Sequence, residues 1–402
     1  MIPDWAEPLF SVGVTGTNGK TSTTLFIAEI LRQSGKSSDV LSETTLGVGL
    51  GPNEIAPRGA EPFIERMRGF AAAGARRLAL EVTSEALAQG WAKRWRFDLG
   101  VFTNLSHDHL NAHGSFEHYL ASKAQLFVHL RPNCSAVFNA SDPASGFIDR
   151  VTPKAVARRY FAAASRGPGL VKAELEATAC RLDRTGTHIE LAPSELAEAF
   201  GGALSIRLIG SVFAENALAA ALAGLAAGAT PEAVRTGLQA LARVPGRFEV
   251  IAQAPCVAID YAHTEDALAR TCDSGRALLS ELGGARLIVV FGAGGGRDVE
   301  KRVPMGRAVG ARADIAIVTN DNPRNEPPEL IASALAAGLR EGGRAELHVE
   351  IDRRKAIARA LEAARPNDVV LICGKGHERE QTLGGESVHF DDAACVRALC
   401  ST

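Results

Sequence analysis

The stretch from Gly13 to Ser22 combines glycines, hydroxyl groups and one lysine in an order that suits phosphate binding. A short apolar run precedes it and helical apolar spacing follows it, so the sequence predicts a strand, a glycine-rich turn and a helix N-terminus. Backbone N–H groups and the helix dipole bind phosphate oxygens at such a turn. The residues predicted to bind a nucleotide triphosphate are Gly16, Thr17, Asn18, Gly19, Lys20, Thr21 and Ser22.

Two side chains of this turn have distinct predicted roles. Lys20 can reach the terminal phosphates and the Thr21 hydroxyl can hold Mg²⁺. The spacing between Gly13 and Gly19 is one residue longer than in the usual P-loop pattern. The alternative is an ordinary glycine turn before a helix.

A carboxylate, Glu81, lies in the predicted strand Leu78–Val82. In open α/β sheets ligands bind at the carboxyl ends of strands, and a buried carboxylate is costly unless it is paired or metal-bound. Glu81 therefore either makes a structural pair or coordinates Mg²⁺. The polar turn with Thr44 and Thr45 follows another apolar run. It either binds substrate or only connects elements.

A dense polar group follows the next predicted strand, Leu99–Thr103. The segment Asn104–Gly114 contains three histidines and one aspartate within seven residues. A solvated loop would explain them without a function, but the place at a strand end favours a site. The spacing does not match a zinc motif, and a hard cation would prefer oxygen ligands.

Ser115 is predicted to cap a helix whose apolar positions include Tyr119 and Phe127. Lys123 lies on the same face, four residues from each. A lysine among apolar neighbours either extends to water or serves the site. A further helix is predicted to start near Ile209 and contains Asn216, as either a capping group or a nucleotide contact.

The second half of the chain predicts another α/β domain. Pro245 and Gly246 break the preceding helix, so we expect domains of residues 1–244 and 245–402. Four apolar strands in the second domain each end in a polar motif, which predicts a binding surface at one sheet edge. These strands are Val257–Asp260, Leu287–Phe291, Ile315–Thr319 and Val369–Cys373.

Composition narrows the class of protein. A chain of 402 residues with 46% hydrophobic content can form two or three domains. A net charge of −2 gives no electrostatic case for binding nucleic acid or an anionic membrane. The seven cysteines are scattered, without a C-x-x-C pair, as in proteins with reduced thiols. With no predicted signal peptide or membrane span, we expect a soluble cytoplasmic protein and no membrane insertion.

Four motifs together resemble the Mur ligase family. They are Gly-x-Thr-Gly-Thr-Asn-Gly-Lys-Thr, Leu-Glu-Val-Thr-Ser, Phe-Thr-Asn-Leu-Ser-x-Asp-His-Leu and Ala-x-Lys-Ala-x-Leu-Phe. Mur ligases are ATP-dependent enzymes that form the amide bonds of the peptide in bacterial cell wall precursors. The chain is most similar to the member that adds the third residue. The fold class implied is α/β, with a P-loop ATPase domain on a parallel-type sheet and a C-terminal Rossmann-like domain.

The resemblance implies a set of site residues in the first domain. Thr21 and Glu81 would hold one Mg²⁺, and His113 would hold a second one together with a carbamate formed from Lys123 and CO₂. The residues implied to contact the nucleotide or the acyl phosphate are Asn104, His109, Asn216, Arg247 and Asp260.

In the second domain, Asp321-Asn322-Pro323-Arg324 resembles the motif that reads the incoming amino acid. Arg324 would grip a distal carboxylate as a bidentate fork, which implies meso-diaminopimelate rather than lysine. Glu378 would bind the distal ammonium group, and Gly374 lies in the same glycine-rich motif. Thr44 and Thr45 are the candidate contacts to the acyl substrate.

The chain also departs from the family pattern. The family has an N-terminal domain for the UDP-sugar, whereas here the P-loop begins at Gly13. We therefore expect that the UDP end binds differently, that a partner supplies this part of the site, or that the acyl substrate is another molecule. Five further residues differ from the family pattern, and together they indicate that the ATP and metal machinery is kept while the acyl-substrate side is altered. They are Glu85, His107, Asn111-Ala112 and Gly296.

The implied reaction joins a small-molecule carboxylate and an amino acid through an acyl phosphate, using ATP and Mg²⁺. The residues expected to act in catalysis are Lys20, Glu81, His109 and Lys123. One alternative is a repurposed Mur-type ligase with another carboxylate and amine. A second is a ligase resembling folylpolyglutamate synthase, and a third is a nucleotide-binding regulatory protein without catalysis.

Overall fold

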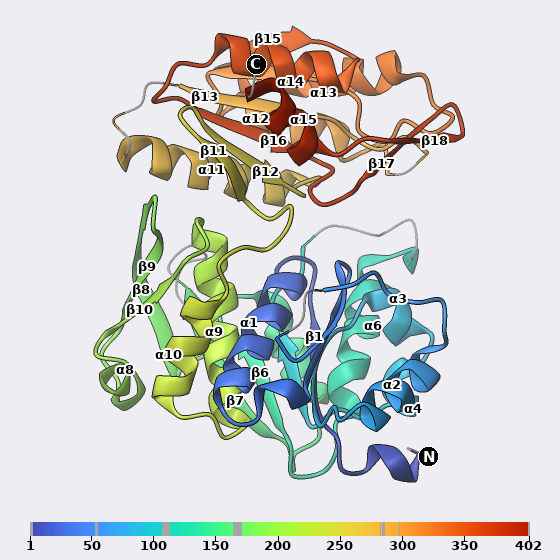
Figure 1. The fold of residues 1–402 in the computed structure, drawn as a ribbon, viewed down its shortest axis with the longest axis vertical. Coiled ribbons are helices and arrows are strands. Elements are labelled where there is room, and N and C mark those ends of the chain that lie inside the picture. Colours follow the sequence, from blue (N-terminus) through green and yellow to red (C-terminus); the bar gives the residue numbers. More distant parts are fainter. Residues whose placement is uncertain are drawn as a thin grey trace. The chain divides into compact units, whose positions relative to one another are not determined.

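The computed structural model describes residues 3–52, 55–106, 113–163, 171–281, 283, 286–296 and 298–400. The chain forms two compact units (Figure 1). Unit 1 comprises Met1–Arg181, Thr187–Arg207 and Ser211–Ala242, and unit 2 comprises Leu182–Gly186, Leu208–Gly210 and Arg243–Thr402. The division of the chain after residue 244 into an ATP-binding domain and an amino-acid-binding domain stays a proposal.

Unit 1 is built on a ten-stranded sheet in the order β10-β9-β8-β7-β6-β5-β1-β4-β2-β3. β1 (Phe10–Thr15) pairs in parallel with β4 (Arg77–Glu81) and with β5 (Leu99–Phe102). β2 also pairs in parallel with β4, so these carboxyl ends lie at one edge of the sheet. The other strands are β2 (Val40–Thr44), β3 (Gly47–Leu50), β6 (Ser135–Asn139), β7 (Ala157–Ala163), β8 (Leu175–Asp183), β9 (Gly186–Leu191) and β10 (Ala203–Ile206).

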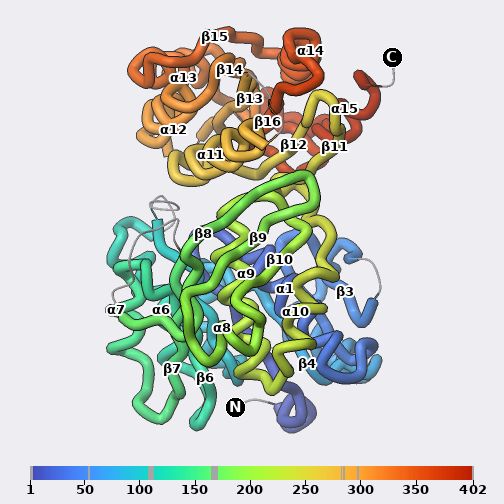
Figure 2. The backbone as a smooth tube through the Cα atoms, turned by 90° about the vertical axis from the view of Figure 1, so that its left-hand side faces the viewer, coloured from blue at the N-terminus to red at the C-terminus, as the bar shows by residue number. Residues whose placement is uncertain are grey.

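Helices cover both faces of this sheet (Figures 1 and 2). One face carries α1 (Lys20–Gln33), α9 (Ser211–Ala226) and α10 (Pro231–Ala240), which contact one another. The opposite face carries a core of strand and helix residues that includes Leu80, Phe102, Phe127 and Met67. The helices packed there are α2 (Phe63–Ala72), α3 (Ser84–Ala88), α4 (Trp91–Arg94), α6 (Phe116–Val128) and α7 (Pro143–Val151).

Local sequence explains several helix ends. The Ser115 Oγ accepts a hydrogen bond from the backbone N–H of His118 at 3.2 Å, which confirms the predicted cap of α6. The segment Phe213–Gly224 of α9 is buried throughout, so this apolar helix is packed on all sides. α2 ends at Ala72, and Gly74 just beyond it adopts a left-handed conformation with φ +103°, which glycine commonly does after a helix end.

Unit 2 contains a six-stranded sheet in the order β11-β12-β16-β13-β14-β15, in which only β11 and β12 are antiparallel. All four strands predicted from sequence are present, and they are adjacent in the sheet. The strands are β11 (Glu249–Gln253), β12 (Cys256–Asp260), β13 (Leu287–Phe291), β14 (Ile315–Val318), β15 (Glu346–Val349) and β16 (Val369–Cys373), with the separate hairpin of β17 (Glu380–Leu383) and β18 (Glu386–His389).

Alternate residues of these buried strands face different helices. Ile288 and Val290 of β13 belong to a core that includes Ile357 and Val396. This face is covered by α14 (Arg353–Ala363) and α15 (Asp392–Cys400). The other face is covered by α11 (Glu265–Glu281), α12 (Arg302–Gly310) and α13 (Pro328–Gly342), as Figure 2 shows. The predicted α/β class with two sheets is therefore confirmed.

The short elements of the chain add little to the core. They are α8 (Glu195–Ala199) and the 3₁₀ turns Asp4–Ala6 and Ser37–Asp39. Among the described residues, no helix has both the length and the apolar character needed to cross a membrane.

Close packing of α10 on α1 supports the helix that carries Lys20. A Cβ atom added at Gly237 would lie 2.5 Å from the Cα atom and 2.6 Å from the backbone nitrogen of Ile30. We expect Gly237→Ala to lower the free energy of unfolding by about 1–3 kcal/mol, because backbone atoms cannot yield as a side chain can. Urea unfolding of the full chain measures this.

The matched control is Gly69→Ala in α2, where an added Cβ would meet no atom within 4 Å. That change should raise the free energy of unfolding by about 0.5–1 kcal/mol, since alanine favours helix over glycine. Equal effects of the two substitutions would contradict the packing argument.

Candidate functional site

Two glycines shape the loop between β1 and α1. Gly19 has φ +83° directly before α1, and an added Cβ would lie 2.2 Å from the Asn216 Oδ1. Gly16 has φ +152°, and an added Cβ would lie 1.9 Å from the Thr103 Oγ1. Side chains from α9 and from the end of β5 therefore approach the loop backbone so closely that only glycine fits at either position.

Polar groups after β5 hold this loop in place. The Asn104 Oδ1 accepts from the backbone N–H of Asn18 at 2.9 Å, and the Asn104 Nδ2 donates to the Asn18 carbonyl at 3.1 Å. The Thr17 Oγ1 lies 3.1 Å from the Tyr119 hydroxyl and accepts from the Ser106 N–H at 3.0 Å. The loop conformation is thus fixed by hydrogen bonds from α6 and from the residues after β5.

A hydroxyl and a carboxylate meet at the first turn of α1. The Thr21 Oγ1 donates to the Glu81 Oε2 at 2.9 Å, and the Thr45 backbone N–H donates to the same oxygen at 3.1 Å. The Thr44 Oγ1 accepts from the Leu46 N–H at 3.1 Å, so Thr44 shapes this turn. Hydroxyl and carboxylate oxygens suit a hard divalent cation such as Mg²⁺. Ser22 is buried in the same turn of α1.

Two lysines converge on one backbone carbonyl. The Lys20 Nζ donates to the Gly16 carbonyl at 3.1 Å and to the Thr17 carbonyl at 2.8 Å. The Lys123 Nζ donates to the Gly16 carbonyl at 2.7 Å and lies 4.3 Å from the centre of the Tyr119 ring. Lys123 is only 1% exposed, so it does not extend to water. The two ammonium groups therefore lie close together beside the glycine loop.

His113 lies beside the same aromatic ring. Its Nε2 is 2.9 Å from the Ser84 Oγ, and its ring centre is 5.1 Å from that of Tyr119. The Ser84 Oγ donates to the Glu85 Oε2 at 3.3 Å. The other polar residues predicted after β5 lie outside the described residues. They are His107, Asp108, His109 and Asn111.

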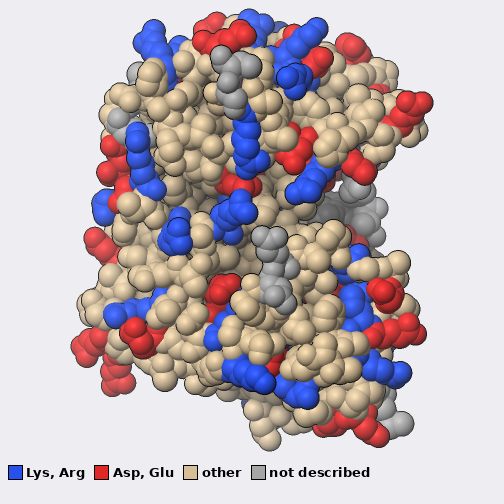
Figure 3. All heavy atoms as spheres, viewed as in Figure 1, with Lys and Arg blue, Asp and Glu red and all other residues tan. Residues whose placement is uncertain are grey.

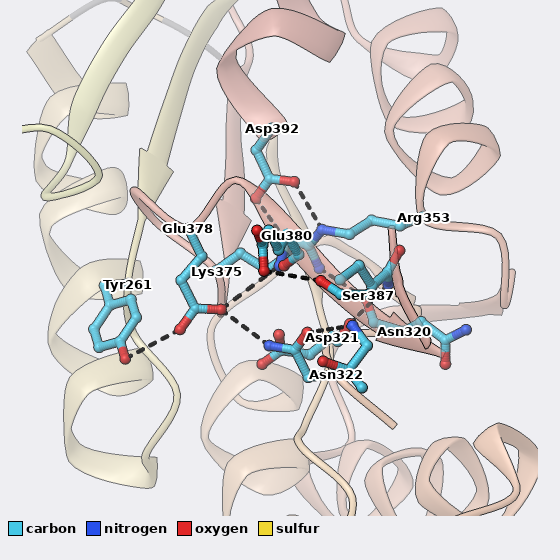
Figure 4. A network of polar contacts seen from close by, with 12 residues as sticks. Tyr261, Asn320, Asp321, Asn322, Arg353, Lys375, Glu378, Glu380, Ser387 and Asp392 are labelled. Atoms are coloured by element: carbon cyan, nitrogen blue, oxygen red, sulfur yellow. Dashed lines mark hydrogen bonds and ion pairs between the residues drawn. The ribbon is translucent and has the colours of Figure 1, made fainter. Parts of the chain in front are cut away.

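In unit 2, polar side chains that follow β12, β14 and β16 meet at the carboxyl ends of these strands (Figure 4). The Asn322 Nδ2 donates to the Glu378 Oε2 at 2.9 Å, and the Tyr261 hydroxyl donates to the Glu378 Oε1 at 3.4 Å. The Lys375 Nζ lies 3.6 Å from the Glu378 Oε2 and donates to the Glu380 carbonyl. The structure thus brings three of the four sequence motifs together around one carboxylate.

Buried charges lie behind this carboxylate. Burial raises the pKa of Asp321, although the cationic Arg353 and Lys375 oppose the shift. A Cβ atom added at Gly374 would lie 3.3 Å from the Asp321 Oδ2, so this glycine lets the two loops touch. Arg353 donates to both carboxylate oxygens of Asp392 at 2.8 and 2.7 Å, with both side chains fully buried. These pairs make the strand-end loops rigid.

Arg247 and Asp260, predicted to contact the nucleotide, lie at the end of β12. The Arg247 guanidinium lies 4.4 Å from the centre of the Tyr261 ring. The Asp260 carboxylate accepts from the backbone N–H groups of Phe248 at 2.7 Å and Ala262 at 2.8 Å. Burial raises the pKa of Asp260, and the nearby Arg247 opposes this shift.

Arg324 has an unusual backbone conformation, with φ +56°. Its N–H donates to the Thr382 carbonyl at 3.1 Å, and its Nη1 donates to the carbonyls of Gly295 at 2.7 Å and Asn322 at 3.4 Å. A non-glycine residue keeps such a conformation only where the surroundings impose it, which is common at ligand sites.

Several contributing residues were not singled out from sequence. The sequence could have pointed to Tyr119, because this residue lies four positions before Lys123 and therefore on the same face of the predicted helix. Thr103 and Ser84 act through contacts with residues far away in the chain, which no local pattern predicts. Lys375 contacts Glu378 and Glu380, which lie three and five residues further along the chain. On the face drawn in Figure 3, acidic and basic side chains are interspersed.

Comparisons with known proteins agree in both units. The family model described as "Mur ligase middle domain" matches residues 14–224, and that described as "Mur ligase, glutamate ligase domain" matches residues 246–376. The UDP-N-acetylmuramoyl-L-alanyl-D-glutamate–2,6-diaminopimelate ligase of Geobacter metallireducens is 37% identical, over 97% of this chain and 79% of the relative. The ligase of the same name from Geobacillus kaustophilus is 36% identical, over 97% and 78%.

Solved structures agree with this result. A structure of a ligase of that same name has a TM-score of 0.65 and 31% identity, over 98% of this chain and 79% of that chain. E. coli FolC in complex with ADP has a TM-score of 0.66 and 21% identity, over 93% of this chain and 88% of that chain, which is a likeness of fold alone.

The loop geometry predicts the effect of Gly19→Ala. The added Cβ would clash with the Asn216 side chain and displace the N–H groups of the loop. We expect the Kd for ATP, measured by calorimetry, to rise at least about tenfold, which corresponds to about 1.4 kcal/mol.

Gly90→Ala is the matched control, because Gly90 also precedes a helix in a left-handed conformation, with φ +78°, and an added Cβ would meet no atom within 4 Å. It should lower stability by about 1–2 kcal/mol through backbone strain but leave the Kd for ATP unchanged. An unchanged Kd in Gly19→Ala would refute the role of the loop.

Proposed function

This chain belongs to the Mur ligase family, and we propose that it is an ATP-dependent ligase that joins a carboxylate to an amino acid and releases ADP and phosphate. The observation that supports the proposal is the ammonium, hydroxyl and carboxylate groups that lie together at the start of α1. Lys20, Thr21 and Glu81 lie there around a glycine loop whose backbone is held by Asn104. Relatives with 36–37% identity are named as ligases.

The proposed amine is a diaminopimelate-type amino acid. The Geobacter and Geobacillus relatives carry 2,6-diaminopimelate in their names. The Arg324 guanidinium would bind the distal carboxylate, and Glu378 would bind the distal ammonium. Asp321, Asn322 and Gly374 would complete the walls of this pocket. A zwitterionic amino acid is matched by a guanidinium and a carboxylate on neighbouring loops.

The proposed acyl substrate is a UDP-muramoyl dipeptide. Thr44 and Thr45 would approach it, since Thr45 already shares the Glu81 carboxylate with Thr21. A carboxylate oxygen of the substrate attacks the γ-phosphorus, and the bond to the leaving ADP oxygen breaks. The amine nitrogen then attacks the acyl carbon, a proton leaves the nitrogen, and the carbon–oxygen bond to phosphate breaks.

The protein contributes charge and positioning to the first step. Loop N–H groups and Lys20 would stabilise negative charge on the transferred phosphoryl group. His109 would lie near the acyl phosphate. The remaining nucleotide contacts proposed are Gly16, Thr17, Asn18, Gly19, Ser22, Asn104, Asn216, Arg247 and Asp260. We expect the enzyme to work in the cytoplasm, where ATP and nucleotide-linked precursors are available.

Two magnesium positions are proposed. Thr21 and Glu81 would hold one ion, and their oxygens are already 2.9 Å apart. His113 and a carbamate on Lys123 would hold the other. Magnesium, when bound, neutralises charge on phosphate oxygens. The Lys123 environment fits a carbamate, because its ammonium shares the Gly16 carbonyl with that of Lys20, and a carbamate would replace one of two like charges by a negative one.

A product assay tests the proposed reaction. Purified protein with Mg-ATP, bicarbonate, UDP-muramoyl dipeptide and meso-diaminopimelate should give the tripeptide and one ADP per peptide bond, read by mass spectrometry. Omitting either substrate should abolish ADP release. ADP release with other carboxylate and amine pairs, but none with these, would instead make the chain a repurposed Mur-type ligase.

Carbamylation of Lys123 has its own test. Protein in ¹³C-bicarbonate should show a carbamate carbon signal by NMR that is absent in Lys123→Ala. The ligase activity of this variant should fall by at least about 10³-fold, since the second magnesium ion, which neutralises charge on phosphate oxygens, would lose one of its ligands. A matched control is Lys93→Ala, because Lys93 lies in α4 of the same unit and is exposed. A wild-type protein without the signal would refute the carbamate.

A further inference from the structure

Glu326 connects two loops that flank the proposed amino-acid pocket. Its Oε2 accepts from the backbone N–H of Gly296 at 3.1 Å, in the glycine loop after β13. Its two carboxylate oxygens accept from the Arg302 Nη1 at 2.6 Å and the Arg302 Nη2 at 2.7 Å. The Arg302 Nη2 lies 3.4 Å from the Gly294 carbonyl of the same loop. Glu326 itself belongs to the loop after β14, two residues beyond Arg324.

This ion pair is a permanent one. The Arg302 side chain is 2% exposed, and a buried guanidinium requires a charged partner. Hydrogen bonds from Arg302 lower the pKa of Glu326 to about 2, so the carboxylate stays ionised at every pH where the enzyme could work. Glu326 contributes stability that is present above its ordinary pKa and is lost only as the pH falls towards 2.

The glycine loop in turn holds Arg324. The Arg324 Nη1 donates to the Gly295 carbonyl at 2.7 Å, and the Gly295 N–H donates to the Asn322 carbonyl at 2.9 Å. A Cβ added at Gly295 would lie 2.0 Å from the Pro323 carbonyl oxygen, so the two loops touch backbone to backbone. The Gly295 carbonyl is thus the nearer of the two acceptors that hold the guanidinium, the other being the Asn322 carbonyl at 3.4 Å.

Within the described residues, only the Nη1 of the Arg324 guanidinium makes hydrogen bonds. Hydrogen bonds there involve the Nη1, whereas the Nε and Nη2 donate none. The Nε and Nη2 together form the edge that grips a carboxylate with two parallel hydrogen bonds. Because the guanidinium is planar, holding Nη1 in place also fixes the direction in which the Nε and Nη2 edge points.

We propose that Glu326 is a positioning residue that sets amino-acid specificity: through Gly296 and Arg302 it fixes the Gly295 carbonyl, which aims Arg324 at a distal carboxylate of the substrate. The inference deepens the proposed function and rests on it. An amino acid without a distal carboxylate, such as lysine, gains nothing from the aimed guanidinium. Loss of Glu326 therefore weakens the preference for diaminopimelate over lysine.

The experiment compares wild type and Glu326→Gln, with diaminopimelate and lysine as alternative amines. We expect the KM for diaminopimelate to rise at least about tenfold in the variant, with kcat within about twofold, because the lost interaction is one of binding. kcat/KM for lysine should stay within about twofold of the wild-type value. Glu326→Asp, which keeps the charge, should restore part of the preference.

Glu341→Gln is the matched control. Glu341 pairs with Arg307 of the same helix α12 through two hydrogen bonds, but this pair is about half exposed. Glu341→Gln should change neither the KM for diaminopimelate nor the KM for lysine. A double variant of Glu326→Gln with Arg324→Lys should lose little more preference than Arg324→Lys alone, since both act on one contact. An equal loss of kcat/KM for both amino acids would overturn the inference. Additive losses of preference in the double variant would overturn it as well.

Amide hydrogen exchange tests the positioning role of Glu326 without any substrate. Glu326→Gln should speed exchange in the segments around Gly296 and Arg324, and Glu341→Gln should not. Unchanged exchange overturns the positioning role. Wild-type protein that does not use diaminopimelate refutes the proposed function, and the exchange result then decides by itself whether Glu326 holds the loop and Arg324.

Discussion

The register of the parallel strands in unit 1 determines which side chains meet at its candidate site. Val14 pairs with Glu81, and Thr15 pairs with Phe102. This register brings the Glu81 carboxylate to the start of α1 and the residues after β5 to the glycine loop. A shift by one residue would turn Glu81 to the other face of the sheet. The positions of three chain segments thus depend on two hydrogen-bond ladders that share β1.

The same principle operates in unit 2, where close approach of loops adds a second constraint. A Cβ added at Gly292 would lie 2.3 Å from the Thr319 carbonyl, so the loops after β13 and β14 touch directly. Loops that touch can share polar partners, as Asn322 and Glu378 do at 2.9 Å. Beneath them Arg353 and Asp392 are buried as an ion pair, since an isolated buried charge would be very costly.

Sequence reasoning predicts the strand ends well but not the partners of the side chains. β13 and β16 have the predicted bounds, because an apolar run followed by glycine leaves little choice. The state of Lys123 could not be predicted from spacing, since burial or extension to water depends on how α6 packs. The pair of Arg302 and Glu326 spans 24 residues, and no local periodicity links two such positions.

The two units differ in the way they arrange charge, and this difference matches two kinds of ligand. In unit 1 the ammonium groups of Lys20 and Lys123 both donate to the Gly16 carbonyl beside the glycine loop, where a polyanion would be attracted by their charge. In unit 2 the Glu378 carboxylate and the Arg324 guanidinium lie on neighbouring loops, so both signs are offered together. A nucleotide triphosphate needs the first arrangement, and a zwitterionic amino acid needs the second. A ligase that joins two substrates with ATP requires both.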